Sequence, residues 1–149
     1  MNHPLRHLGK VILAAALLAV APLANAGKEA VKSKLLAAAV QIAAKYPGME
    51  VRYMNTDVLR QGGVAIYKGV YQGETQYVQL AVRGNADQDV DLAVFDEGKN
   101  EVCKDVDVDA QAGDISVCAH TPRWTGNFIV AVQMSQGSGW YGYMVMHEQ

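Results

Sequence analysis

The chain has 149 residues, about one domain's worth, and half of them are hydrophobic while 19% are charged, which is a globular rather than a disordered composition. Its formal net charge of −2 argues against a duplex-DNA binder, which normally carries a basic face. Two cysteines are too few for a four-cysteine zinc site, and no P-loop or dinucleotide-binding glycine motif is present.

The first 26 residues have the three parts of a secretory signal peptide. Arg6 and Lys10 are basic, an apolar run extends from Val11 to Leu23, and Ala24-Asn25-Ala26 is an A-x-A cleavage site. The run has 13 residues, whereas a membrane-spanning helix needs about 20. We therefore expect residues 1–26 to be removed and the mature chain, beginning at Gly27, to reach the bacterial periplasm or the outside medium.

Residues 27–48 are predicted to form an N-terminal segment with a single helix from Lys28 to Tyr46. Apolar residues recur there at steps of three and four and form one stripe, as in an amphipathic helix. The stripe consists of Val31, Leu35, Ala38, Ala39, Ile42 and Tyr46. Pro47 and Gly48 end the helix, because proline disfavours helical backbone at the preceding residue and glycine permits a turn. We expect the stripe to pack on the rest of the chain, with docking on a partner as the alternative.

Residues 49–149 are predicted to form one antiparallel β-sandwich of seven to eight strands. Apolar and polar residues alternate there, for example at Val78, Leu80 and Val82 and again from Phe128 to Met134. Glycine-containing turns separate short runs, which is typical of sandwiches and barrels. The fold class is therefore mostly β, with a jelly-roll-like sandwich preceded by one α-helix.

Cys103 and Cys118 are the only cysteines in the chain. In an oxidising compartment an even number of cysteines indicates a disulfide. The closed loop of about 15 residues would contribute about 3 kcal/mol of stability. A free thiol nucleophile and a metal ligand are the alternatives, and His120 is the only imidazole nearby. We expect the disulfide.

An acidic segment from Asp87 to Asp114 contains ten carboxylates and two lysines. If residues 101–109 and 114–120 were neighbouring antiparallel strands with the cysteines opposite each other, Asp107 would face Asp114 and the disulfide would lie on the polar surface. Facing like charges are unfavourable, so either a cation bridges them or this register is wrong. Calcium prefers such oxygen ligands. A solvated strand face that resists aggregation is the alternative. The candidate calcium ligands are Asp105, Asp107, Asp109 and Asp114.

Three stretches resemble motifs of bacterial pre-peptidase C-terminal (PPC) domains. Residues Asp89–Asn100 resemble the family's "DVDLxVYDxxGN" core, Thr121–Phe128 are similar to "TPxxxGxYxxxV", and Gly139–Tyr143 are similar to the closing "GxYxL" strand. The resemblance covers residues 64–147. It implies a jelly-roll sandwich that aids binding or secretion rather than catalysis. Because no protease is attached, it implies a stand-alone periplasmic protein.

No catalytic residues are predicted. A catalytic triad needs an imidazole, and His120 and His147 are the only histidines left once residues 1–26 are removed. No G-x-S-x-G motif is present. An unrecognised hydrolase is therefore the least favoured interpretation, and no cofactor is expected other than the possible calcium.

A binding role is predicted instead, with a protein or another cell-envelope component as the partner. Trp124 and Trp140 lie close to glycines, in settings where an exposed indole often marks a contact. Ser138-Gly139-Trp140-Tyr141 also resembles the SGxY loop of some periplasmic lysozyme inhibitors. The favoured function is a non-catalytic exported binding or accessory module, with lysozyme inhibition through that loop as the alternative.

Overall fold

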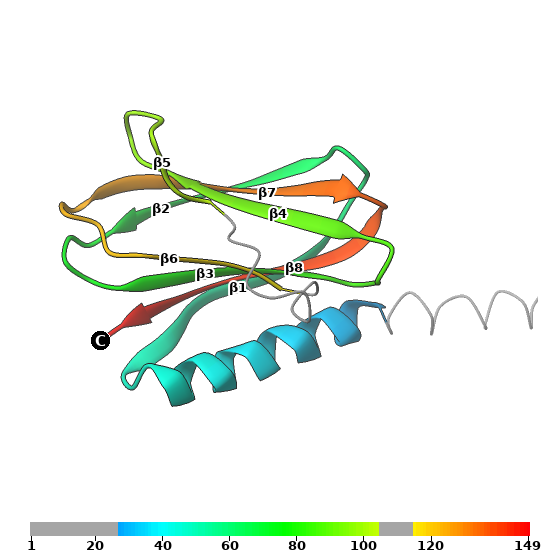
Figure 1. Cartoon of the computed structure of the whole chain (residues 1–149), viewed down its shortest axis with the longest axis horizontal. Coiled ribbons are helices and arrows are strands. Elements are labelled where there is room, and N and C mark those ends of the chain that lie inside the picture. The colour runs from blue at the N-terminus through cyan, green and yellow to red at the C-terminus, as the bar shows by residue number, and fades with distance from the viewer. Residues whose placement is uncertain (1–26, 105–114) are drawn as a thin grey trace, which may run out of the picture.

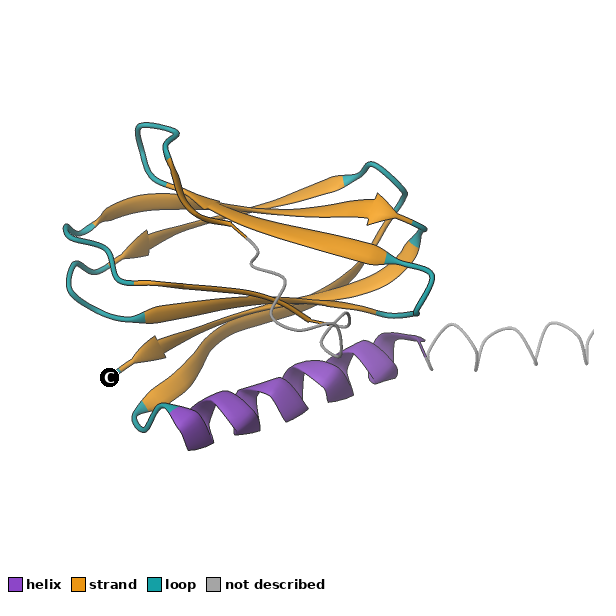
Figure 2. Ribbon diagram, in the orientation of Figure 1, coloured by secondary structure: helices purple, strands orange, loops and turns teal. Residues whose placement is uncertain are grey.

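The computed structural model describes residues 27–104 and 115–149, which form three layers (Figure 1). Two four-stranded antiparallel sheets face each other, and the helix of residues 27–45 lies along the outer side of one of them (Figure 2). The predicted fold class, a mostly β sandwich with one N-terminal helix, is confirmed. Within the described ranges, no helix has the length and apolar character needed to cross a bilayer.

The strands follow one another as eight elements from residue 49 to residue 148. Sheet A, next to the helix, has the strand order β1-β8-β3-β6, with β1 at Met49–Leu59, β8 at Gly139–Glu148, β3 at Tyr77–Arg83 and β6 at Ile115–His120. Sheet B has the strand order β2-β7-β4-β5, with β2 at Val64–Tyr71, β7 at Gly126–Gln136, β4 at Asp89–Phe95 and β5 at Glu101–Lys104.

The main core lies between the two sheets and follows the predicted alternation. On β4, Leu92 and Val94 are buried, and on β7, Val130 and Val132 are fully buried. Side chains of period two point to one face of a strand, so these residues meet the inward face of sheet A. Burial of each such side chain contributes about 1.5–3 kcal/mol.

The helix packs on the outer face of sheet A, as its apolar stripe predicts. Val31 and Leu35 are fully buried and share a second core cluster with Val82 and Met144. Gly142 on β8 allows the close approach, because a Cβ there would lie 2.6 Å from Val31 Cγ1 and 2.7 Å from Leu35 Cδ1. The central strands of sheet A are therefore buried on both faces.

The predicted disulfide between Cys103 and Cys118 is present, with a Cα–Cα distance of 5.9 Å. Of the two alternatives for the register around it, the second holds: the strands are not neighbours, because β5 pairs with β4 in sheet B whereas β6 pairs with β3 in sheet A. The bond therefore joins the two sheets, and Cys118 is 1% exposed within the core instead of lying on a polar surface. Alternation predicts which face a side chain occupies but does not identify the neighbouring strand.

This correction removes the reason for placing two carboxylates opposite each other. The register that set Asp107 against Asp114 required β5 and β6 to be neighbours in one sheet, and they are not. The four candidate calcium ligands lie outside the described residues: Asp105, Asp107, Asp109 and Asp114.

The two long sides of the sandwich differ. At one side the edge strands β5 and β6 are joined by the disulfide. At the other side the edge strands are β1 and β2, which belong to different sheets and have no ladder between them. This second side is therefore where the interior of the sandwich can open to solvent.

Candidate functional site

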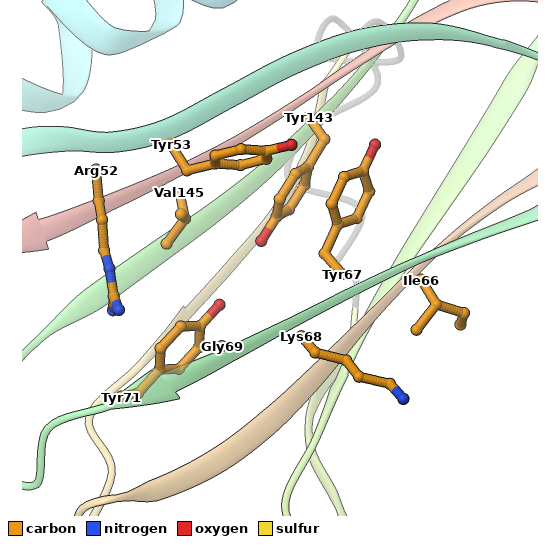
Figure 3. Close-up of a pocket in the computed structure, with 9 residues that line it drawn as sticks. All are labelled: Arg52, Tyr53, Ile66, Tyr67, Lys68, Gly69, Tyr71, Tyr143 and Val145. Atoms are coloured by element: carbon orange, nitrogen blue, oxygen red, sulfur yellow. The ribbon is translucent and has the colours of Figure 1, made fainter.

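A pocket of about 450 Å³ lies between β1 and β2, at the side of the sandwich without a disulfide (Figure 3). We call it the open-edge pocket. Residues from both sheets line it: Arg52, Tyr53, Ile66, Tyr67, Lys68, Gly69, Tyr71, Tyr143 and Val145. Four of these nine residues are tyrosines and two are cationic, so the lining is aromatic and basic.

A β-bulge directs Arg52 into this gap. The register of β1 with β8 shifts between Val51 and Tyr53, which leaves Arg52 without a partner in the ladder. A bulge of this kind re-aims the side chain of the extra residue. The Arg52 Nη2 donates a 2.7 Å hydrogen bond to the carbonyl of Val70 on β2, and its guanidinium lies 5.2 Å from the centre of the Tyr71 ring. Arg52 therefore bridges the two sheets by a hydrogen bond and a cation–π contact.

A second side-chain bridge crosses the same gap. Asn55 Nδ2 on β1 donates a 3.0 Å hydrogen bond to the hydroxyl of Tyr67 on β2. The Tyr67 hydroxyl also lies 2.6 Å from that of Tyr141 on β8. Burial raises the pKa of Tyr141, so its hydroxyl keeps its proton in alkaline as well as in neutral solution. The edges of β1 and β2 are thus fixed at two points.

A buried glutamine orders the inner wall of the pocket. Gln79 on β3 is fully buried; its Oε1 accepts a 2.5 Å hydrogen bond from Tyr143, and its Nε2 donates a 2.9 Å bond to Tyr71. The Tyr143 ring stacks on Tyr67 with 4.1 Å between ring centres. Because both amide atoms are engaged, the two tyrosines are held in one orientation. Burial also raises the pKa of Tyr143, which therefore remains a donor.

Only part of this lining is open to solvent. Tyr53 is 48% exposed and Arg52 is exposed, whereas Tyr71 and Tyr143 are buried. Figure 3 shows the side chains of Ile66 and Lys68 pointing away from the tyrosine rings, on the other side of β2. The accessible surface is therefore an aromatic ring and a guanidinium in front of a rigid wall. Such a surface suits stacking and charge-assisted hydrogen bonding with a ligand.

No family model matches the sequence, and no curated protein matches it. The pre-peptidase C-terminal domain of a collagenase from Bacillus anthracis is similar in structure, with a TM-score of 0.50 and 11% identity over 62% of this chain and 87% of that one. The fold is PPC-like. Two PliG proteins, periplasmic inhibitors of g-type lysozyme, also match. That of Aeromonas hydrophila has a TM-score of 0.48 and 13% identity over 70% of this chain and 90% of that one. That of Salmonella Typhimurium has a TM-score of 0.46 and 12% identity over 68% and 88%.

In the PPC-like sandwich, Tyr141 is an interior residue. Its side chain is 1% exposed and forms the hydrogen bond with Tyr67 described above. On the same strand Trp140 points to the helix, where its Cδ1 lies 2.8 Å from the position of a Cβ on Gly27. Of the segment that resembles an inhibitor loop, only Ser138 is exposed, and its hydroxyl accepts a 2.9 Å hydrogen bond from the backbone of Gln61. A lysozyme contact through this segment would therefore have to use Ser138, Gly139 and the edge of Trp140.

Trp124 lies at the other end of the PPC-like sandwich. It is 54% exposed in the connection between β6 and β7, beside a shallow pocket of about 290 Å³ that Arg123 and Phe128 also line. Ser138 follows β7 whereas Trp124 precedes it, so the length of this 11-residue strand, about 35 Å, separates them. The predicted partner-binding residues therefore do not form one site.

Arg52 and Tyr53 are not among the site residues that the sequence predicts. A bulge has no signature in a run of β-forming residues, so the direction of the Arg52 side chain was not predictable. The spacing of Tyr67, Gly69 and Tyr71 places all three on one face of β2. Apolar residues at the alternate positions, such as Ile66, face solvent instead. On this strand the tyrosines face the interior and the aliphatic residues face solvent. The alternation of tyrosine with aliphatic residues is therefore the one sequence feature that indicates an aromatic inner face for β2.

Proposed function

We propose that the protein is an exported, non-catalytic binding or accessory module, and that its partner, a protein or another component of the bacterial envelope, contacts the open-edge pocket. The observation that carries this proposal is the exposed pair of Arg52 and Tyr53 in front of a tyrosine wall fixed by Gln79. Aromatic and arginine side chains at a rigid surface are typical binding determinants. The neighbouring free edges of β1 and β2 also expose backbone groups to which an extended partner segment could add.

The environment of His120 supports a non-catalytic role. The ring is 8% exposed and stacks on Tyr77, and desolvation by burial lowers its pKa from 6.5 to about 4. An imidazole that stays neutral and enclosed at neutral pH is a poor general acid or base for an external substrate. Among residues 27–104 and 115–149, moreover, no three His, Cys, Asp or Glu residues are grouped so as to hold a metal ion.

Export is supported by the disulfide, because such bonds persist in oxidising compartments. Together with the signal-like segment of residues 1–26, it leads us to expect a mature chain that begins at Gly27. Mass spectrometry of the protein recovered from a periplasmic or culture-medium fraction measures this directly. A chain that keeps its first 26 residues in the cytoplasm would contradict it.

The binding role is tested by affinity capture from a bacterial envelope extract with three forms of the purified protein. Tyr53→Ala removes the exposed ring, while Val40→Ala, at a helix position that is 71% exposed and far from the pocket, is the matched control. We expect wild type and Val40→Ala to retain the same partner, and Tyr53→Ala to retain about tenfold less, since loss of an aromatic anchor typically costs more than 1 kcal/mol.

Two other outcomes would contradict the proposal. Equal capture by all three forms would place the contact away from the pocket. Turnover of an envelope polymer that is lost in His120→Ala would identify a hydrolase instead.

The alternative function, lysozyme inhibition, is measured on the same preparations. Inhibition that is lost in Trp140→Ala and retained in Tyr53→Ala would favour the Ser138–Tyr141 segment over the open-edge pocket as the binding site.

Calcium binding by Asp105, Asp107, Asp109 and Asp114 is kept as a separate proposal that rests on their carboxylates alone. Calorimetric titration with calcium is expected to give heat in wild type and none in Asp107→Ala. The absence of heat in wild type would remove the proposal.

A further inference from the structure

A second pocket, of about 390 Å³, adjoins the open-edge pocket, and Arg52 lines both. We call it the donor pocket, because each polar side chain that lines it carries an N–H or O–H group. Its lining consists of Arg52, Val70, Gln72, Tyr77, Thr125 and His147, and among these described residues none is acidic. Hydrogen-bond donors and a cation without a counter-charge favour an oxyanion as the ligand.

The guanidinium of Arg52 is held in place by contacts that leave most of its donors open. It lies 5.2 Å from the centre of the Tyr71 ring and 5.8 Å from that of the Tyr77 ring, and its Nη2 donates one hydrogen bond, to the Val70 carbonyl. A guanidinium has five N–H groups arranged as two forks, so one complete fork remains whichever Nη2 hydrogen binds Val70. Among the residues that the structure describes, Arg52 has no carboxylate within ion-pair distance. The open fork matches the two oxygens of a carboxylate.

His147 and Thr125 add two donors to the same pocket. The His147 ring stacks on Tyr77 with 6.2 Å between ring centres, on the tyrosine that the Arg52 guanidinium also contacts. Thr125 Oγ1 accepts a 3.0 Å hydrogen bond from the backbone N–H of Gly73, so the hydroxyl is held in place while its own proton is left to donate. Both residues therefore offer a donor within the pocket that the guanidinium lines.

The charge of the lining favours a carboxylate over a phosphate. Glu50 is opposite His147 in the register of β1 with β8, but its carboxylate accepts a hydrogen bond from the side-chain amide of Gln149 and does not line the pocket. Among the described residues of the lining, Arg52 is the one arginine or lysine. A group with a single negative charge therefore matches the pocket, whereas a phosphate with about two charges exceeds it.

We propose that the donor pocket binds a carboxylate of an extended peptide segment, with the Arg52 fork as its main contact and Thr125 and His147 as flanking donors. Because Arg52 lines both pockets, this rests on the proposed function and adds the chemical group that the partner presents. A peptide is favoured over an acidic sugar because β1 and β2 are edge strands, whose unpaired backbone groups can hydrogen-bond to an extended main chain.

NMR titration of the purified protein tests the proposal with three probes. They are acetyl-trialanine with a free C-terminal carboxylate, the same peptide as its C-terminal amide, and an amidated peptide that ends in aspartate. Because Arg52 is exposed, the free carboxylate is expected to bind weakly, with a dissociation constant of about 1 mM, and the amide at least tenfold more weakly. Binding of the aspartate peptide would support recognition of any peptide carboxylate, and its failure to bind would support recognition of a chain terminus.

Four variants identify the groups that hold the carboxylate. Arg52→Gln is expected to weaken binding about tenfold, and Arg52→Lys nearly as much, because lysine keeps the charge and loses the fork. Thr125→Val is expected to weaken binding about threefold, and it leaves Arg52 in place should the arginine variants fold poorly. Arg60→Gln, which removes an exposed arginine beyond the far end of β1, is the matched control and is expected to bind as wild type does.

Equal binding of the carboxylate and the amide would overturn the proposal, as would wild-type affinity in Arg52→Gln. Glucuronate or inorganic phosphate that binds more tightly than the peptides would overturn the choice of a peptide. Envelope capture with the same variants separates this proposal from the function on which it rests. A partner that Tyr53→Ala loses and Arg52→Gln retains would contradict only the carboxylate contact. Peptide binding that depends on Arg52, together with equal capture by wild type and Tyr53→Ala, would contradict only the proposed function.

Discussion

Replacement of both cysteines by alanine is expected to lower the unfolding free energy by about 3 kcal/mol. The bond between Cys103 and Cys118 closes a sequence separation of 15 residues, and the loop-closure entropy of that length gives this magnitude. The bond also joins the edge strands β5 and β6, which lie in different sheets and share no ladder. Because Cys118 belongs to the buried core, its loss also removes packing.

Urea unfolding of wild type and of the Cys103→Ala/Cys118→Ala variant, each with and without a thiol reductant, measures this effect. The reductant is expected to bring wild type close to the stability of the variant and to leave the variant unchanged. The slope of the transition should be steeper in the variant, because a chain without the cross-link exposes more surface when it unfolds. A reductant effect on wild type below about 1 kcal/mol would show that the two sheets are held together without the bond.

The parts of the fold that depend on one strand or one helix at a time could be predicted from the sequence. A period of two residues specifies which side chains of a strand share a face, and Leu92, Val94, Val130 and Val132 are buried as that period predicts. The stripe containing Val31 and Leu35 likewise identified the buried face of the helix. Both inferences rest on local geometry, which the neighbouring strands do not alter.

The parts that depend on which strands are neighbours could not be predicted in this way. The short separation of Cys103 and Cys118 is compatible with one hairpin, whereas β5 belongs to sheet B and β6 to sheet A. The likeness of Ser138–Tyr141 to an inhibitor loop predicts an accessible Tyr141, whereas Tyr141 lies on β8, a central strand that is buried on both faces. The open-edge pocket depends on the bulge at Arg52 and on the juxtaposition of two edge strands. Neither has a local sequence signature.

Acidification is expected to destabilise the protein through His120. The ring lies between aromatic side chains, with Tyr71 and Tyr77 each 5.7 Å away and Phe128 5.9 Å away. Its Nε2 is 3.4 Å from Gln79 Nε2, and its Nδ1 is buried without a hydrogen-bond partner in the described part of the chain. No acidic side chain is among these neighbours, so a proton on the ring would be an unpaired buried charge, and desolvation lowers the pKa from 6.5 to about 4.

The direction of the effect follows from the two pKa values. Between pH 6.5 and about pH 4 the unfolded chain binds a proton at His120 and the folded chain does not, so the unfolding free energy falls as the pH falls through this interval. The unfolding free energy lost to this group over the interval is about 3 kcal/mol, and above pH 6.5 His120 no longer makes the unfolding free energy depend on pH.

Urea unfolding at a series of pH values measures this dependence. Between pH 6.5 and about pH 4 the unfolding free energy of wild type is expected to fall with pH much more steeply than that of His120→Phe. His120→Gln serves as a second neutral replacement, and stability at pH 8 confirms that each variant folds. Parallel pH curves for wild type and both variants would mean that His120 is hydrated or paired when it is protonated, which would contradict the burial argument.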